Sequence, residues 1–333
     1  MISPFCANSQ PHTIEIRIVL VPILAVALIN MQTGAHAQIA FSSDRGGDVD
    51  IYVMDEDGSN VIQLTNHPSS DVNPDWSPDG TQIAFETLRH ERMKTDRNFE
   101  IYVMDADGGN PTRLTDDPLV DASPTWSPYG NRIAFASNRH GTGDIYVMND
   151  DGGNLRRITH DDTNRSPYDW APAWSPNGRL IAFESTRGGR GSDIWLMHSD
   201  GTNPIHLHKN GGHDTSPVWS PDGKQIAFAS RGGKNFTWEI RRIDADGEGL
   251  KSLTSNLVND NWPDWSPSGE QIAFSSDRDG NYEIYLMNPD GEDLHNLTNH
   301  PAHDYTPSWF PATLAVTERE KLPTQWSAIK SKR

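Results

Sequence analysis

The sequence is poor in cysteine, in basic residues and in long hydrophobic runs. Among its 333 residues there is one cysteine, Cys6, and an apolar run from Ile18 to Ile29 is too short to span a bilayer comfortably. Lys and Arg number 28 against 46 Asp and Glu, a formal net charge of −18. This acidic excess repels phosphate backbones and anionic lipids, so we expect no nucleic acid partner. A cationic protein surface, a metal ion or a neutral glycan is compatible with it.

Residues 1–37 predict a signal peptide. Arg17 precedes the apolar run, and a polar stretch then ends in Ala35-His36-Ala37, the small-x-small pattern that signal peptidase needs. We expect cleavage after Ala37, with an uncleaved membrane anchor as the alternative. Cys6 would be removed with this segment, which excludes cysteine catalysis and thiolate metal sites in the mature protein. The sequence therefore predicts a periplasmic or otherwise exported protein.

From Gln38 onward a repeat fills the chain. Versions of I-A-F begin at Ile39, Ile83, Ile133, Ile181, Ile226 and Ile272. A tryptophan followed by Ser-Pro or Phe-Pro recurs at Trp76, Trp126, Trp174, Trp219, Trp265 and Trp309, spaced by 50, 48, 45, 46 and 44 residues. Short strands repeated at this period are typical of propeller blades. We predict an all-β, six-bladed β-propeller over residues 38–313, with four antiparallel strands in each blade.

The third repeat illustrates the strands that we expect in a blade. From the innermost outward, they are Pro124 to Ser127, Arg132 to Ala136, Asp144 to Met148 and Leu155 to Thr159. A type I turn with proline at its second position joins the first two strands, and a turn ending in Gly152 joins the last two. Helix signals are nearly absent, which favours a propeller over a helical solenoid.

The two ends of the repeat array predict how the ring closes. The mature chain begins with the second strand of one blade, and Tyr305 to Pro311 supplies an innermost strand with no partner after it. We expect this C-terminal strand to complete the N-terminal blade, because closure leaves no open sheet edge. Residues 314–333 would then form a tail outside the ring.

These motifs resemble the TolB-like β-propeller family, whose blades carry D-x-x-P-x-W-S-P-D-G, I-A-F-x-S-x-R and I-Y-x-M-D-x-D-G. The resemblance covers Gln38 to about Pro311. It implies a propeller used for protein contacts, because TolB is a periplasmic protein of the Tol-Pal envelope system. In TolB an α/β domain precedes the propeller, whereas here the predicted signal peptide runs directly into the first blade. We therefore expect a stand-alone relative that lacks the TolB N-terminal domain.

An aspartate stands five residues before each repeat tryptophan, at Asp71, Asp121, Asp169, Asp214, Asp260 and Asp304. Six such carboxylates are expected to ring one mouth of the channel, where they could hold Ca²⁺. An arginine recurs in the hairpin on the same face, at Arg45, Arg89, Arg139, Arg187, Arg231 and Arg278. One Asp and one Arg in every blade favours the structural alternative, repeated ion pairs or caps on loop amides. No other cofactor is predicted.

Positions where the repeats differ are the better candidates for ligand binding. Beside the aspartates lie the non-repeating residues Tyr168, Trp170, His213, Trp262, His303 and Tyr305. Aromatic side chains at a concave, carboxylate-lined mouth could stack on sugar rings or grip a peptide side chain. The alternative is that they pack the lip of the channel.

Two other patterns look like metal sites but have simpler explanations. The D-x-D-G turns and their variants lack the spacing and the distal Glu of an EF-hand, so hairpin geometry explains them; they lie at Asp55, Asp105, Asp150, Asp200, Asp244 and Asp290. His206 and His208 would point to one side of a predicted outer strand, with His213 near in sequence. No third ligand is evident, which favours accidental exposure over chelation.

The second repeat has a longer hairpin with several basic residues, Arg89, His90, Arg92, Lys94 and Arg97. This basic finger would either contact an acidic partner or remain a solvated loop.

The leading hypothesis from the sequence is non-catalytic binding of a protein or envelope-associated partner through the channel face. No G-x-S-x-G elbow is present, and the repeats supply no acid-base pair distinct from the repeated aspartates. An exported carbohydrate-active enzyme or sugar-binding propeller is the rival, because propellers host glycosidases and lyases. A purely structural module of a larger envelope complex is the third alternative.

Overall fold

The computed structural model describes residues 38–89, 98–160, 167–189, 191–209, 212–232 and 236–311. The predicted signal peptide, residues 1–37, and the predicted tail, residues 314–333, lie outside these ranges, as does the basic finger beyond Arg89. Throughout the described ranges the chain forms strands joined by turns and bends, and it contains no helix that could cross a membrane.

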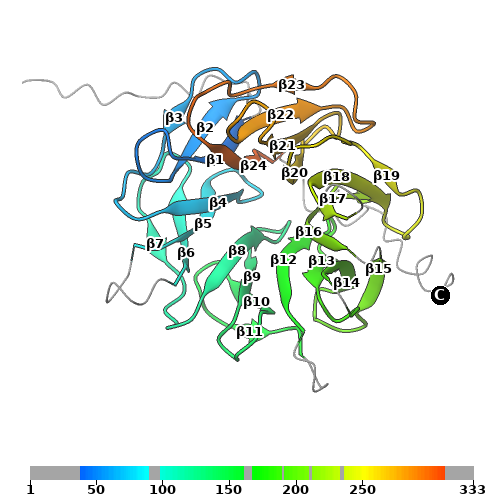
Figure 1. Ribbon diagram of the computed structural model, residues 1–333. Coiled ribbons are helices and arrows are strands. Elements are labelled where there is room, and N and C mark those ends of the chain that lie inside the picture. The colour runs from blue at the N-terminus through cyan, green and yellow to red at the C-terminus, as the bar shows by residue number, and fades with distance from the viewer. Residues whose placement is uncertain are drawn as a thin grey trace, which may run out of the picture. The chain divides into compact units, whose positions relative to one another are not determined.

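The described strands form six separate four-stranded antiparallel sheets arranged as blades around a centre, which confirms the predicted six-bladed propeller (Figure 1). Blades two and three consist of β4 (Asp71–Trp76), β5 (Gln82–Thr87), β6 (Glu100–Asp105) and β7 (Thr112–Arg113), and of β8 (Asp121–Trp126), β9 (Arg132–Ser137), β10 (Asp144–Asn149) and β11 (Arg156–Arg157). Blade four consists of β12 (Asp169–Trp174), β13 (Leu180–Ser185), β14 (Asp193–His198) and β15 (Ile205–His208). Blades five and six consist of β16 (His213–Trp219), β17 (Gln225–Arg231), β18 (Trp238–Asp244) and β19 (Lys251–Ser252), and of β20 (Asp260–Trp265), β21 (Ile272–Ser276), β22 (Glu283–Met287) and β23 (His295–Asn296).

Blade one is built from both ends of the propeller, as the sequence predicts. Its sheet order is β24 (Asp304–Trp309), β1 (Gln38–Ser43), β2 (Asp50–Asp55) and β3 (Ile62–Gln63). The C-terminal strand β24 pairs antiparallel with β1, with Ile39 opposite Trp309 and Ser43 opposite Asp304. Figure 1 shows this orange strand beside the blue one, and β24 also contacts β20 and β4 on either side. The ring is thereby closed without a covalent joint and without an exposed sheet edge at the seam.

The innermost strands begin earlier than the repeat pattern suggests. In blade three the inner strand starts at Asp121, three residues before the predicted Pro124, and its pairing with β9 shifts register between Ala122 and Thr125. Ser123 lies in this bulge with φ of 53°. The same bulge recurs around the ring, at Asn73, Ala171, Ser216, Trp262 and Thr306. An extra residue in the inner strand therefore bends it and redirects its side chains.

The outermost strands are shorter than predicted. In blade three the expected strand from Leu155 to Thr159 is reduced to Arg156 and Arg157, because only those residues pair with β10. Thr159 is instead buried, and its hydroxyl accepts a hydrogen bond from the backbone N–H of Ile145.

The hydrophobic core lies between neighbouring blades. Between blades two and three, for example, Ile101 and Val103 pack against Trp126, Phe135 and Met148. The phenylalanine of every I-A-F copy is fully buried: Phe41, Phe85, Phe135, Phe183, Phe228 and Phe274. Burial of one such side chain contributes about 1.5–3 kcal/mol, so each blade interface is stabilised chiefly by these repeated apolar residues.

Tight turns join the inner strand to the second strand of each blade. In blade two the N–H of Gly80 donates to the carbonyl of Ser77 over 2.8 Å, and Gly80 adopts φ of 71°. A Cβ atom at Gly80 would lie 2.2 Å from the ring of Phe310, so only glycine fits. Phe310 also packs edge-on against Trp76, with ring centroids 5.0 Å apart. The residue that follows the last strand thus fastens blade one to blade two.

Candidate binding site in the central channel

The six inner strands surround a central cavity of about 380 Å³. Each inner strand begins at its aspartate, or one residue before it in β16, and ends at its tryptophan, so the channel has two different mouths. We call the aspartate end the channel face and the tryptophan end, where the tight turns lie, the turn face. Four of the side chains lining the cavity at the bulges are small and polar, Asn73, Ser123, Ser216 and Thr306. The large aromatic side chains that line the cavity are Trp170 and Trp262.

One aromatic group lies on blade four. Tyr168 and Trp170 stack with ring centroids 4.9 Å apart and planes 8° apart, and Tyr168 is 40% exposed. Gly143 of the neighbouring blade packs so closely under this pair that a Cβ atom there would lie 2.7 Å from Tyr168. Burial, together with the charges of Glu184 and Glu86, raises the pKa of the Tyr168 hydroxyl above its usual range. The phenol therefore stays neutral and remains a hydrogen-bond donor.

A second aromatic group lies where blades six and one meet. Trp262 contacts Tyr305, with ring centroids 6.1 Å apart, and meets Tyr282 edge-on at 5.7 Å. His303 extends this group: its ring is 6.1 Å from that of Tyr282, whose N–H donates to its Nδ1 over 3.1 Å. Burial raises the pKa of Tyr305 to about 12, so this hydroxyl is also neutral. The sequence analysis did not identify Tyr282, an aromatic residue in a hairpin on the same face.

His213 stands apart from both aromatic groups. It is exposed at the start of β16 in blade five, and the N–H of Ser192 donates to its Nδ1 over 3.4 Å. The six residues predicted to bind a ligand thus divide into a Tyr168–Trp170 pair, a cluster of Trp262, His303 and Tyr305, and a single histidine.

Five of the six repeated aspartates form ion pairs with arginines of their own blades. Arg139 Nη2 donates to Asp121 Oδ2 over 2.6 Å, and the aspartate side chain is fully buried. Arg139 also lies over the rings of Phe135 and Tyr146, 5.6 and 5.0 Å from their centroids. The same ion pair recurs as Asp71–Arg89, Asp169–Arg187, Asp260–Arg278 and Asp304–Arg45.

This geometry does not suit the calcium alternative. Five of the six carboxylates each give an oxygen to a guanidinium group, and all six aspartates are at most 1% exposed. Within the described ranges no three His, Cys, Asp or Glu side chains converge as metal ligands would. The donor set therefore fits charge pairing inside each blade better than an ion on the channel axis.

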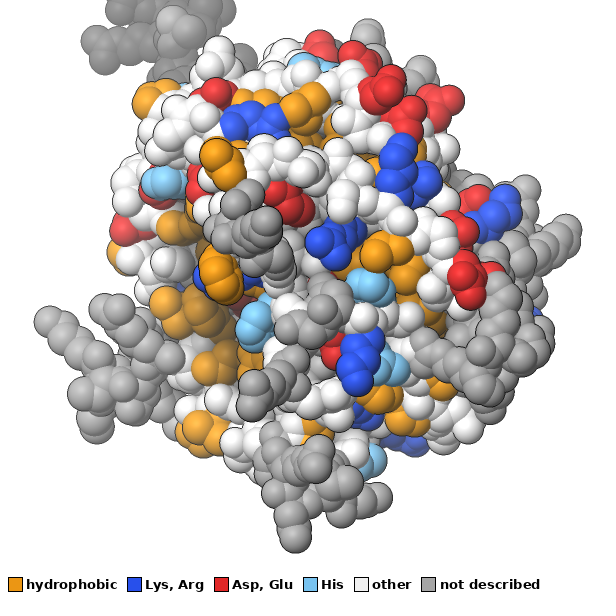
Figure 2. All heavy atoms as spheres, turned by 45° about the vertical axis from the view of Figure 1, so that its right-hand side comes forward, with side chains coloured by type: hydrophobic (Ala, Val, Ile, Leu, Met, Phe, Trp, Pro, Cys, Tyr) orange, Lys and Arg blue, Asp and Glu red, His pale blue; other side chains and the backbone are white. Residues whose placement is uncertain are grey.

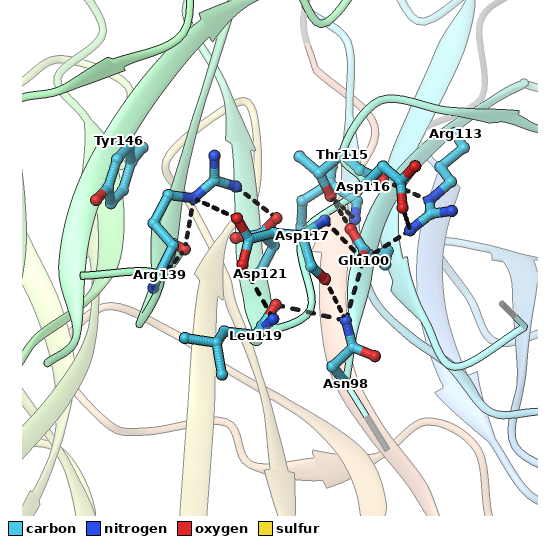
Figure 3. A network of polar contacts seen from close by, with 12 residues as sticks. Asn98, Glu100, Arg113, Thr115, Asp116, Asp117, Leu119, Asp121, Arg139 and Tyr146 are labelled. Atoms are coloured by element: carbon cyan, nitrogen blue, oxygen red, sulfur yellow. Dashed lines mark hydrogen bonds and ion pairs between the residues drawn. The ribbon is translucent and has the colours of Figure 1, made fainter. Parts of the chain in front are cut away.

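A second set of acidic residues lies at or next to the start of the third strand of every blade, and the sequence analysis did not identify it. Its members are Asp50, Glu100, Asp144, Asp193, Glu239 and Glu283. Figure 3 shows that Glu100 accepts hydrogen bonds from Arg113, Thr115 and Asn98, and Asp117 links this network toward Arg139. In the sequence each of these acidic residues directly precedes the I-Y of its repeat or the equivalent pair, and this pattern could have identified them. These carboxylates hold the loop between the outermost strand and the next blade.

The two histidines of blade four do not share a ligand position. His206 Nε2 lies 3.0 Å from Asp193 Oδ2, and its ring stacks on Trp195 at 4.5 Å. His208 Nε2 instead lies 3.9 Å from Asp214 Oδ2 of blade five. Each imidazole has its own carboxylate.

The D-x-D-G turns act as hairpins. In blade one the N–H of Gly58 donates to the carbonyl of Asp55, and the Asp55 side chain accepts from Asn60 Nδ2 over 2.7 Å. Of the basic finger, Arg89 is described, and it is the partner of Asp71.

One side of the molecule carries side chains of both charge signs (Figure 2). Figure 2 shows Lys, Arg and His side chains among acidic and hydrophobic ones on one side of the molecule. A partner would therefore meet a mixed surface there.

Two models of propeller families match parts of the chain. Residues 96–192 match the N-terminal β-propeller domain of tricorn protease, and residues 163–256 match the TolB β-propeller domain.

Curated relatives are similar over short segments. A TolB homolog of Chlorobaculum tepidum is 44% identical over 62 residues, 17% of this chain and 14% of that protein. The Tol-Pal system protein TolB of Syntrophotalea carbinolica is 43% identical over 47 residues, 14% of this chain and 11% of that protein. The matched segments thus span about one-seventh or less of the lengths of these relatives.

Solved structures share the fold over most of the chain. TolB from Acinetobacter baumannii superposes with a TM-score of 0.70 at 23% identity, covering 83% of this chain and 67% of that one. A putative TolB from Agrobacterium tumefaciens gives 0.62 at 21% identity, covering 83% and 99%. An oligogalacturonate lyase in complex with manganese gives 0.53 at 15% identity, covering 75% and 85%. At these identities the likeness concerns the fold alone.

Proposed function

Because this chain carries a TolB-like β-propeller, we propose that it is an exported, non-catalytic binding protein that engages a protein partner through the channel face. The observation that carries the proposal is the pair of aromatic groups at that face. Five of the six blades form the buried Asp–Arg pair. The large aromatics are not part of the repeat, because the residues equivalent to Trp262 are small and those equivalent to Trp170 vary from Ala122 to Tyr305. Large aromatics in a cavity are the residues that most often anchor protein interfaces.

The relatives support a protein rather than a small-molecule partner. They are named as TolB proteins, and one is named as part of the Tol-Pal system. By the same analogy we propose an envelope location for this chain. Recovery of the secreted form with Gln38 as its first residue would support the predicted cleavage, and a protein that keeps residues 1–37 and stays in the membrane fraction would contradict it.

A pull-down from envelope extract tests the partner proposal. The purified protein is compared with a Trp170→Ala, Trp262→Ala, Tyr305→Ala variant, which truncates side chains in both aromatic groups. The matched control truncates three exposed apolar side chains outside the central cavity, Tyr129, Leu155 and Leu294. We expect a protein that binds the native chain and the control but not the channel variant. A partner that binds all three equally would place recognition elsewhere and refute the role of the channel face.

A glycan ligand is the second proposal, and one observation favours it. Tyr168 is exposed and stacks on the half-buried Trp170, which lines the central cavity together with the hydroxyl and amide side chains of Ser123, Ser216 and Asn73. An aromatic face beside hydrogen-bonding groups suits a sugar ring. One solved propeller of this fold is an oligogalacturonate lyase, so turnover of acidic oligosaccharides is worth assaying. Thermal stabilisation by envelope glycans that is lost in the Trp170→Ala variant would favour this alternative over a protein partner.

A further inference from the structure

A second cavity, of about 230 Å³, lies at the turn face. Its walls are repeated aromatic and ring side chains, including Trp76, Trp126, Trp174, Trp265, Trp309 and the turn prolines. Asp75 and Asp264 line both this cavity and the central one, so they lie where the two meet. The turn-face cavity is therefore apolar on its sides and acidic at its inner end.

The propeller repeat does not require these two carboxylates. Asp75 and Asp264 each precede a repeat tryptophan, and the equivalent residues in the other blades are Thr125, Ala173, Val218 and Ser308. Four blades thus form the same inner strand without an acidic side chain at this position. The two aspartates also belong to blades two and six, the immediate neighbours of blade one.

Both carboxylates are held in place by backbone groups rather than by cations. Asp75 Oδ2 accepts from the N–H of Trp126 over 2.6 Å, and Asp264 Oδ2 accepts from the N–H of Trp309 over 2.7 Å. Burial raises the pKa of Asp75 to about 7 and that of Asp264 to about 8, and the charge of Asp75 adds to the effect on Asp264. Within the described residues neither forms an ion pair with Lys, Arg or His.

We propose that the turn-face cavity binds an alkylammonium group, that is, an ammonium on an apolar stem, as in a lysine side chain or an alkyl diamine. The methylene stem would pack against the tryptophan and proline walls. The ammonium carries three N–H donors and no acceptor, which matches two carboxylates that line one cavity. Indole rings attract cations as well, so the walls of the turn-face cavity and its acidic inner end both favour an alkylammonium ligand.

This site is distinguishable from the proposed partner site, because Trp170, Trp262 and Tyr305 do not line the turn-face cavity, although Asp75 and Asp264 also line the central one. Loss of alkylammonium binding is therefore distinguishable from loss of partner binding. The Trp170→Ala, Trp262→Ala, Tyr305→Ala variant is expected to keep alkylammonium binding, and an Asp75→Asn, Asp264→Asn variant is expected to keep the protein partner.

Titration of the purified protein with n-butylammonium chloride, followed by tryptophan fluorescence and calorimetry, tests the proposal. n-Pentanol is the neutral probe of similar shape. Asp222→Asn is the matched control, because Asp222 lies in a turn of the same face but does not line the turn-face cavity. We expect saturable binding that is at least about tenfold weaker for n-pentanol and for the Asp75→Asn, Asp264→Asn variant, since charge-assisted hydrogen bonds would be lost. The control should bind like the native protein.

Two further measurements test the role of the carboxylates and the source of the ammonium group. Binding at pH 7.5 should release protons, measured as a dependence of the calorimetric heat on the buffer, because the ammonium stabilises the ionised carboxylates. N-acetyl-lysine methylamide and putrescine then distinguish a peptide side chain from a free diamine as the source of the ammonium.

Several outcomes would overturn the proposal. The first is that protein with a native melting transition shows no saturable binding of any alkylammonium ion. The second is that the Asp75→Asn, Asp264→Asn variant binds as tightly as the native protein, and the third is that n-pentanol binds as tightly as n-butylammonium. Calcium chloride that binds at the two aspartates while alkylammonium ions do not would equally reject it in favour of an inorganic cation.

Discussion

Asp214 of blade five faces His208 of blade four, with Oδ2 and Nε2 3.9 Å apart. The five equivalent aspartates instead face an arginine of their own blade. The arginine of blade five, Arg231, instead donates from Nε to the carbonyl of Phe236 over 2.8 Å. One of the six repeats has therefore exchanged the intrablade ion pair for a contact between blades, although its Asp and Arg are both present in the sequence.

Arg139→Met should destabilise the propeller strongly, whereas Arg231→Met should not. The first substitution leaves the buried Asp121 carboxylate without its guanidinium partner, and breaking a buried pair typically costs about 3–5 kcal/mol, reduced here to about 2–4 because Arg139 is partly exposed. The second removes an exposed bond to a carbonyl, for which about 1 kcal/mol or less is expected. Urea unfolding of both variants measures the difference. Equal losses of unfolding free energy in the two variants would show that the Arg139–Asp121 ion pair does not stabilise the channel face.

The unfolding free energy of the native protein should fall as the pH rises from about 5 to 8.5. The pKa values of Asp75 and Asp264 in the fold, about 7 and about 8, lie above the value of about 4 expected for an unfolded chain. Folding therefore favours their protonated forms; this contribution is complete below pH 4 and is lost as the pH passes 7 to 8. Glu86, with a pKa raised by burial to about 7, adds to the trend.

Asp75→Asn should flatten this dependence. Its amide oxygen can still accept from Trp126, while the charge that becomes costly above pH 7 is absent. We expect the variant to gain about 1–2 kcal/mol relative to the native protein between pH 5 and pH 8.5, measured by chemical denaturation at both values. An unchanged slope would mean that Asp75 is solvated well enough to ionise normally.

Closure by β24 predicts a sharp dependence on the C-terminal boundary. A chain ending at His303 lacks β24, so the edge of β1 and the side of β4 are exposed, and Trp309 no longer fills its core cluster. We expect this chain to be insoluble or to lack a cooperative melting transition. A chain ending at Pro311 keeps every strand of the six described sheets and should melt like the full protein. Similar melting of both chains would contradict the role of β24.

Ala171→Asn should stabilise the inner strand of blade four. Ala171 adopts φ of 47°, a left-handed conformation that asparagine tolerates better than alanine, and blade two has Asn73 in the same bulge. A gain of about 0.5–1 kcal/mol is expected. Ala173→Asn, two residues further along the same strand, is the control, because Ala173 is not among the residues with positive φ. The melting temperatures of the two variants give the comparison.

Much of the candidate site follows from reading the repeats against one another. Comparison of the six copies picked out Trp170 and Trp262 as exceptions, and the structure places both on the central cavity. The same comparison could have picked out Asp75 and Asp264, which are acidic where the other copies are not. It did not reveal Tyr282, because its place beside Trp262 depends on how the hairpin of blade six folds over the channel face.

The sequence by itself determined the number of blades, the strand order within each and the closing strand, because each repeat carries its own apolar pattern and turn residues. Only the tertiary structure decided which charges meet. Arg231 and Arg139 occupy the same place in the repeat, yet one guanidinium reaches an aspartate and the other a backbone carbonyl. Such pairings depend on side-chain positions set by packing between blades, and so does the distance between Asp75 and Asp264, which are far apart in the chain.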